Sequence, residues 1–260
     1  MTHREKISKG FSFFSNLGSD SKGLPLKTKT EMQSKLIRSI LKNDITFASG
    51  SAGTGKTFVA IACAAKLLQE KEINKIVLLR PPVETGKSIG FLPGDMSEKF
   101  APYLLPFYDS FLKILGNDKF QKYLEEGKIE MSPLTFIRGS TQNSFTILDE
   151  AQNCTKAEME MFITRLGQDG KFVITGDGSQ TDIKGAASGF DHAIHILEHI
   201  DGVGVVEFTE DDIVRHRIVK EAILAYRNDR AIPYNRKGVE TNGGYYSNLE
   251  SNILSSTNEL

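Results

Sequence analysis

The stretch Gly50-Ser51-Ala52-Gly53-Thr54-Gly55-Lys56-Thr57 decides the fold, because it has the spacing of a phosphate-binding loop. It follows a short apolar stretch over 44–48 and precedes a helical pattern over 56–70. Its glycines allow positive φ angles and close backbone approach, so that successive N–H groups converge on phosphate oxygens. The helix that begins there adds the positive end of its dipole. The sequence therefore predicts a strand, a phosphate-binding loop and a helix in succession.

Two side chains of this loop have a chemistry of their own. Lys56 is expected to reach the β- and γ-phosphates of a nucleotide, and the Thr57 hydroxyl to ligate Mg²⁺. The alternative is a flexible glycine-rich turn, but a chance match of this pattern is on the order of one in a hundred for a chain of this length. The expected nucleotide-binding residues are Gly50, Ser51, Ala52, Gly53, Thr54, Gly55, Lys56 and Thr57.

A second motif, Asp149-Glu150-Ala151-Gln152, follows an apolar strand candidate over 144–148. A carboxylate at such a strand end holds the magnesium shell, so we expect Asp149 to lie beside Thr57 as a metal ligand. Glu150 is placed to orient and deprotonate a water aimed at the γ-phosphate. The alternative is two surface acids that open a loop. The preceding strand and the upstream phosphate-binding loop favour catalysis.

A third motif, Gly176-Asp177-Gly178-Ser179-Gln180, again stands just past an apolar strand candidate, over 171–175. In open α/β sheets ligands lie beyond the carboxyl ends of the strands. Gln180 is therefore expected to hydrogen-bond the γ-phosphate or the attacking water. Taken alone, the motif would be an ordinary turn, since glycine and aspartate are common turn residues.

Strand and helix signals alternate along the middle of the chain. Apolar runs predict strands over 44–48, 75–80, 129–131, 144–148, 171–175 and 203–208. Helical patterns lie over 56–70, 96–126 with an interruption near Gly116, 155–166, 188–199 and 211–226 with a possible break. Thr155 and Glu158 have the spacing of a capping box. Continuous apolar strands separated by helices predict an α/β fold with a doubly wound, mostly parallel sheet.

The chain is expected to consist of a single domain between two tails. Residues 1–27 show no sustained period and are expected to be flexible, and the domain is expected over 28–230. Residues 231–260 are rich in Asn, Ser, Thr and Gly, a composition that does not easily form a core.

Composition excludes several classes of protein. Hydrophobic residues make up 39% and charged residues 25% of the 260 residues, which is ordinary for a globular protein. The longest apolar run, over 58–65, is far shorter than the ~20 residues that span a bilayer, so no membrane partner is expected. Two cysteines in a chain of this length indicate free thiols of a reducing compartment, and we expect a cytoplasmic protein. The net charge of −1 gives no support for a nucleic-acid partner.

The three strand-end motifs resemble motifs I, II and III of superfamily 1 helicases, in the form GxxGTGKT, DEAQ and GDxxQ. The stretches RPPVETG over 80–86, GFLPGD over 90–95 and VRH over 214–216 resemble the PhoH-like ATPase family. The similarity extends from about residue 28 to residue 227. It implies a RecA-like P-loop domain that hydrolyses ATP with Mg²⁺, often as a ring oligomer, with a helicase-like relation to RNA or single-stranded DNA. Family members occur in bacteria and bacteriophages, and this chain is a candidate bacteriophage member.

The resemblance also concerns a glutamine and several arginines. In the helicase relatives a Gln at the distance of Gln33 from the loop reads the adenine edge, although Gln33 alone could be a solvated helix residue. A γ-phosphate transition state also needs a positive finger. No second RecA-like strand-helix series is visible, so a neighbouring subunit is expected to supply it. The candidates are Arg80, Arg138, Arg165 and above all Arg215, which is expected to start the last helix.

Three classes of function stay open at this stage. The first is an ATP-driven motor on RNA or single-stranded DNA, expected as a closed head-to-tail ring of six subunits. The second is a nucleotide-gated regulatory or assembly module with slow hydrolysis. The third is a small-molecule kinase, which Glu150 argues against, because a water-activating base would waste ATP.

Overall fold

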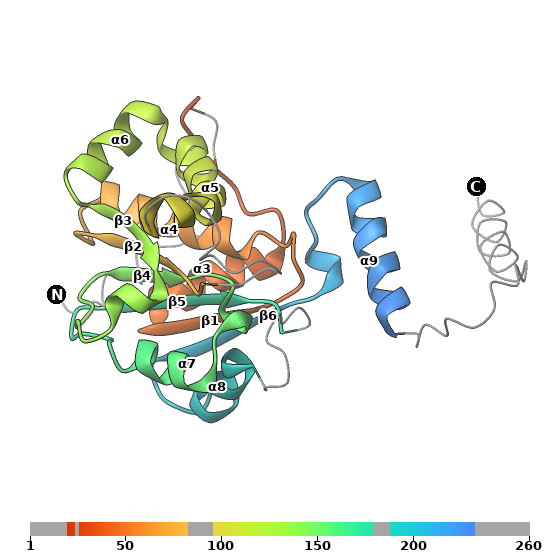
Figure 1. Cartoon of the computed structure of the whole chain (residues 1–260). Coiled ribbons are helices and arrows are strands. Elements are labelled where there is room, and N and C mark those ends of the chain that lie inside the picture. The colour runs from red at the N-terminus through yellow and green to blue at the C-terminus, as the bar shows by residue number, and fades with distance from the viewer. Residues whose placement is uncertain (1–19, 24–25, 83–95, 179–187, 232–260) are drawn as a thin grey trace, which may run out of the picture. The chain divides into compact units, whose positions relative to one another are not determined.

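The structure is a computed structural model that describes residues 20–23, 26–82, 96–178 and 188–231 (Figure 1). The chain divides into two compact units, residues 1–216 and 217–260. In the described part, the first unit contains a six-stranded sheet, and the second contains the helix α9 (Arg217–Ala231). None of the helices described combines the length and the apolarity that crossing a bilayer requires.

The sheet confirms the predicted α/β fold class. Its strands run in the order β3-β2-β4-β5-β1-β6, and every neighbouring pair is parallel. The bounds are β1 (Ile45–Gly50), β2 (Ile76–Arg80), β3 (Ile129–Pro133), β4 (Phe145–Leu148), β5 (Lys171–Gly176) and β6 (Val203–Phe208). Each predicted strand is present within one or two residues of its expected bounds. The strand of the third motif, β5, lies between the strand of the phosphate-binding loop and the strand of Asp149, in a RecA-like P-loop domain.

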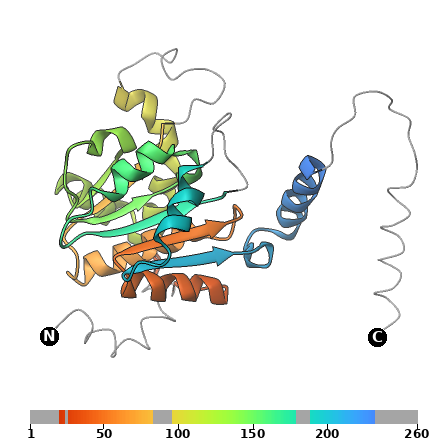
Figure 2. The ribbon, with the colours of Figure 1, turned by 90° about the horizontal axis from the view of Figure 1, so that it is seen from below.

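Helices cover both faces of the sheet (Figures 1 and 2). On β2, Ile76 and Leu78 face one core cluster, whereas Val77 and Leu79 face the other. This alternation with both sides buried explains why the strands read as continuous apolar runs. The first face carries α3 (Glu31–Lys42), α4 (Lys56–Gln69), α5 (Met96–Leu115) and α6 (Asn117–Glu125). The second carries α7 (Lys156–Ile163) and α8 (Gly189–Leu197).

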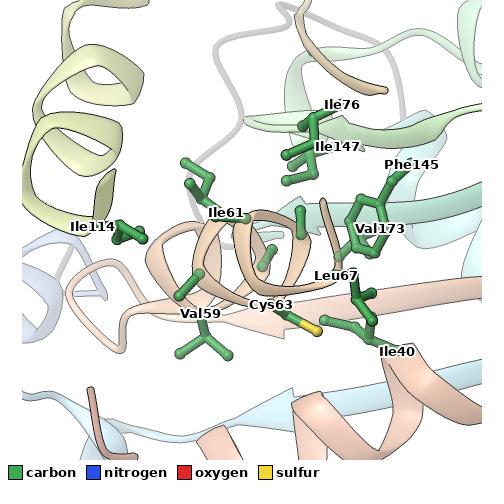
Figure 3. Packing of buried hydrophobic residues seen from close by; sticks show 14 of the residues in the cluster. Ile40, Val59, Ile61, Cys63, Leu67, Ile76, Ile114, Phe145, Ile147 and Val173 are labelled. Atoms are coloured by element: carbon green, nitrogen blue, oxygen red, sulfur yellow. The ribbon is translucent and has the colours of Figure 1, made fainter. Parts of the chain in front are cut away.

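Helix α4 is buried on nearly all sides, which holds its N-terminus at the phosphate-binding loop. In Figure 3 its apolar side chains lie among Ile147 and Val173 of the sheet, Ile40 of α3 and Ile114 of α5. Cys63 on this helix is completely buried, and burial raises the pKa of its thiol to about 12. Both cysteines are free and buried.

The structure adds one helix to those expected and corrects the position of Arg215. Helix α3 was not predicted, although Thr30 caps it by accepting from the Gln33 N–H and three apolar residues of it are buried at helical spacing. The possible break in the helix expected over 211–226 is present, because a 3₁₀ turn, Glu210–Asp212, is followed by the separate α9. Arg215 therefore does not start a helix but lies two residues before one. By contrast, the capping box of Thr155 and Glu158 is confirmed at the start of α7.

Candidate nucleotide-binding site

The phosphate-binding loop connects β1 to α4 as predicted. Gly50, Gly53 and Gly55 all have positive φ angles, of 129°, 86° and 84°. A Cβ added at Gly50 would lie 2.1 Å from the carbonyl oxygen of Phe208 on β6, so the backbones approach too closely for any side chain. The loop conformation therefore depends on glycine both for its dihedral angles and for its packing.

Lys56 lies inside the ring formed by this loop. Its ammonium donates to the carbonyl oxygens of Gly50 at 2.5 Å and Ser51 at 2.8 Å. Burial lowers the pKa of Lys56, while three nearby carboxylates act in the opposite direction. These carboxylates belong to Asp177, Asp149 and Glu150. The cation is thus held where the strand ends converge.

Asp149 connects the strand ends of the site. Its Oδ1 accepts from the hydroxyls of Thr57 and Thr175, each at 2.6 Å. Its side chain is almost fully buried, so it has little contact with solvent that could replace these bonds. The structure thereby brings Thr57 and Asp149 together as the sequence predicted. The Thr57 hydroxyl and the Asp149 carboxylate offer hard oxygen ligands of the kind that Mg²⁺ prefers. They fit a magnesium ion shared with nucleotide phosphates.

Arg80 is a close partner of Asp149 that sequence reasoning did not foresee. Its Nε and Nη2 donate to Asp149 Oδ2 at 3.1 and 2.6 Å, and Nη2 lies 3.7 Å from Glu150 Oε1. Its Nη1 donates to the Tyr103 carbonyl oxygen at 2.8 Å. The sequence suggests Arg80 only as a candidate finger for a neighbouring subunit. Within this chain it forms an ion pair with the expected metal ligand.

Glu150 follows β4 at a strained position, with a φ of 58°. Desolvation at the cavity wall and the charge of Asp149 raise the pKa of Glu150, while Gln152 and the positive charges of Arg80 and Lys56 lower it. Gln152 donates to Glu150 Oε2 at 2.6 Å and accepts from the Asp177 N–H at 3.0 Å. This buried glutamine orients the carboxylate from behind. It stands at the fourth position of the Asp-Glu-Ala-Gln motif, which is the one signal that pointed to it.

The third motif is described only in part. The carboxylate of Asp177, just past β5, accepts from the backbone N–H of Ala52 at 3.1 Å. The carboxyl end of β5 is thus bonded to the phosphate-binding loop. Gln180 lies outside the described residues, so its expected contact with the γ-phosphate stays a prediction.

Gln33 is a buried bridge rather than a solvated helix residue. Its Oε1 accepts from the Lys29 N–H at 2.8 Å, and its Nε2 donates to the Thr54 carbonyl oxygen at 2.9 Å. One amide hydrogen and one lone pair stay available for a ligand. Gln33 therefore connects the segment before α3 to the loop, and its contact with adenine stays a prediction.

Arg215 lies against the phosphate-binding loop of its own chain. A Cβ added at Gly53 would lie 2.9 Å from Arg215 Cγ, and the Val214 N–H donates to the Gly53 carbonyl oxygen at 3.1 Å. The segment after β6 is thereby bonded to the loop. This position favours contact with a nucleotide on the same chain.

A cavity of about 700 Å³ unites these groups. Its volume lies within the range typical of sites for small molecules and cofactors. Its lining includes Gln33, Gly53, Lys56, Thr57, Arg80, Asp149, Glu150 and Arg215. Within the described ranges, no cluster of three or more His, Cys, Asp or Glu side chains could hold a metal alone. With Thr57 and Asp149 as protein ligands, a magnesium ion here would complete its shell with water and phosphate oxygens.

Comparison with solved structures finds a helicase and a large terminase at low similarity. The chain is 14% identical to the UvsW helicase from bacteriophage T4, with a TM-score of 0.44 over 79% of this chain and 67% of that one. It is 14% identical to the large terminase of a thermophilic bacteriophage, with a TM-score of 0.46 over 81% and 51% of the two chains.

Sequence comparison is more specific. A "PhoH-like protein" of Bacillus subtilis is 46% identical over 209 residues, which cover 80% of this chain and 66% of that protein. "Protein PhoH" of Escherichia coli is 40% identical over 206 residues, which cover 78% and 58% of the two chains. The chain thus spans less than two thirds of the length of either relative. Residues 25–227 also match the family described as "PhoH-like protein". This match confirms the resemblance, and the chain belongs to the PhoH-like protein family.

Proposed function

We propose that the chain binds ATP together with Mg²⁺ and hydrolyses it. The observation that carries this proposal is the 2.6 Å hydrogen bond between Thr57 of the phosphate-binding loop and Asp149 at the end of β4, with Glu150 beside it. A metal ligand, a loop for phosphates and a general base meet in one cavity. This combination is what phosphoryl transfer to water requires.

Each residue has a separate task in this proposal. The loop N–H groups and Lys56 bind the β- and γ-phosphates, and Thr57 with Asp149 holds the metal. When bound, the magnesium ion neutralises charge on the phosphate oxygens. Glu150 orients the attacking water and accepts its proton, and Gln152 holds that carboxylate in place by its 2.6 Å hydrogen bond.

Steady-state release of phosphate from ATP by the purified chain tests this proposal. We expect turnover that needs Mg²⁺, and that is lost when Glu150 is replaced by Gln. A small-molecule kinase would instead hydrolyse ATP only poorly without its substrate, and Glu150→Gln would have little effect on its transfer reaction. Turnover that survives Glu150→Gln would therefore reject the assignment of the base.

We further propose that the ATPase works as an oligomeric ring on RNA or single-stranded DNA. The proposal rests on the resemblance of the strand-end motifs to those of superfamily 1 helicases. The second candidate is a nucleotide-gated regulatory module with slow hydrolysis. The ATPase rate with and without added RNA or single-stranded DNA separates the two, because stimulation of more than a few-fold is expected only of the motor.

A further inference from the structure

The contact between Arg80 and Asp149 has a consequence for how the site accepts its metal. The guanidinium of Arg80 donates twice to one oxygen of Asp149, Oδ2, at 3.1 and 2.6 Å. The other oxygen, Oδ1, accepts from the hydroxyls of Thr57 and Thr175. Each of the two oxygens of this carboxylate thus accepts two hydrogen bonds from within the protein.

Arg80 is held in this position from its outer side. Its Nη1 donates to the carbonyl oxygen of Tyr103, and its guanidinium lies 4.8 Å from the centre of the Phe107 ring. Both residues belong to α5, and Phe107 is fully buried. With only 15% of its side chain exposed, the guanidinium is directed at the carboxylates rather than at solvent.

The burial of Asp149 makes this positive charge important. The residue is 4% exposed, and a buried carboxylate without a cation keeps an uncompensated charge. Arg80 provides that cation without a metal ion. A magnesium ion beside Thr57 and Asp149 would carry charge of the same sign as the guanidinium and would compete with it for the same carboxylate.

We propose that Arg80 is a positioning residue that acts through Asp149. It compensates the charge of Asp149 without metal and competes with Mg²⁺ for the carboxylate of Asp149, so that it raises the magnesium concentration that nucleotide binding requires. The inference rests on the proposed function, since it concerns the metal of the same site. Arg80, at the end of β2, thereby sets the magnesium concentration at which this chain binds nucleotide.

The test is a magnesium titration of nucleotide binding, followed by the fluorescence of an ATP analogue labelled on its ribose. It compares the wild type with Arg80→Gln and with Arg38→Gln, a matched loss of one positive charge at an exposed position of α3 outside the cavity. For Arg80→Gln the half-saturating magnesium concentration is expected to fall by about tenfold, the change expected for a close charge pair. For Arg38→Gln it is expected to stay at the wild-type value.

The outcomes separate the inference from the proposed function. An unchanged or higher magnesium requirement in Arg80→Gln overturns the inference. Loss of a residue that supports the metal, or that only supports the fold, does not reduce the magnesium concentration needed for nucleotide binding. Failure of the wild type to bind the analogue at any magnesium concentration instead rejects the proposed function. If circular dichroism shows that Arg80→Gln does not fold, Arg80→Lys takes its place. Lysine cannot make both hydrogen bonds to Asp149 Oδ2, so the half-saturating magnesium concentration of Arg80→Lys should lie below that of the wild type. A value that is not lower overturns the inference.

Discussion

At the residue scale, the site separates binding from chemistry. Lys56 lies inside the loop, where its ammonium contacts two carbonyl oxygens and is surrounded by carboxylates. Glu150 lies at the cavity wall, hydrogen-bonded from behind by Gln152. Because one side chain is placed for phosphates and the other for water, their substitutions are expected to have different effects.

Lys56→Ala is expected to abolish nucleotide binding or turnover. It removes the cation that the loop places against the β- and γ-phosphates. Equilibrium binding of labelled ATP and steady-state phosphate release measure the effect, with circular dichroism as a check of the fold. Wild-type turnover in the purified variant would overturn the assignment of the phosphate site.

Glu150→Gln is expected to keep nucleotide binding and to lower hydrolysis by at least ~100-fold, the typical contribution of a general base. The amide retains the shape of the side chain and leaves Asp149 intact. Single-turnover hydrolysis and nucleotide affinity are measured on the same sample. An equal loss of affinity in this variant and in Lys56→Ala would mean that Glu150 is a metal or structural residue.

At the scale of elements, the approach of β1 to β6 constrains the loop. A side chain at Gly50 would meet the Phe208 carbonyl oxygen at 2.1 Å and would need a φ of 129°. Gly50→Ala is expected to lower the free energy of unfolding by about 3 kcal/mol or more, as strain and overlap add. Gly127→Ala is the control, because its φ is also positive but its Cβ would have open space. For that control a loss of about 1 kcal/mol in the free energy of unfolding is expected. Equal losses for the two variants in urea denaturation would contradict the overlap between a Gly50 side chain and the Phe208 carbonyl oxygen.

A second prediction at this scale concerns Cys63, because the burial of helix α4 controls the reactivity of its thiol. The pKa of the thiol rises from 9.0 to about 12, so it stays protonated in the folded chain well above neutral pH. Because folding raises the pKa of this acid, the protonated thiol contributes to the free energy of unfolding below pH 9. This contribution is lost as the pH rises from 9 towards 12. Cys154 is also buried with a raised pKa.

Labelling with a thiol reagent at pH 8 checks this prediction. We expect almost no reaction in the native state and two thiols per chain in guanidinium chloride, because unfolding exposes both cysteines. Rapid labelling of one thiol under native conditions would show that the core around α4 opens easily.

At the scale of the whole molecule, the question is which chain uses Arg215. Because Arg215 lies against Gly53 of its own chain, a mixture of Arg215→Ala and Lys56→Ala proteins is expected to stay inactive. An arginine acting across a subunit boundary would instead restore activity at hybrid interfaces, so recovery in the mixture would return Arg215 to a role in trans. Light scattering with ATP tests the proposed ring separately, since an oligomer has a mass several times 28.8 kDa.

The parallel sheet and the core of the site could be predicted from the sequence alone. Apolar runs determine which segments are strands, and the phosphate-binding loop determines where one of them ends. The carboxyl ends of parallel strands meet at one edge of a sheet, and Asp149 follows its strand as a magnesium ligand does, so Thr57 and Asp149 were expected to lie close together. The hydrogen bond between them confirms this inference.

The order of the strands and the partners of the arginines were decided only by the tertiary structure. Periodicity shows that a residue is buried but not which strand lies beside it. The contact of Arg80 with Asp149 arises because β2 pairs with β4, two strands that are not consecutive in the chain. Arg215 meets Gly53 because the segment after β6 returns to the loop. Such contacts between distant segments depend on packing of the whole sheet, which no local pattern of residues records.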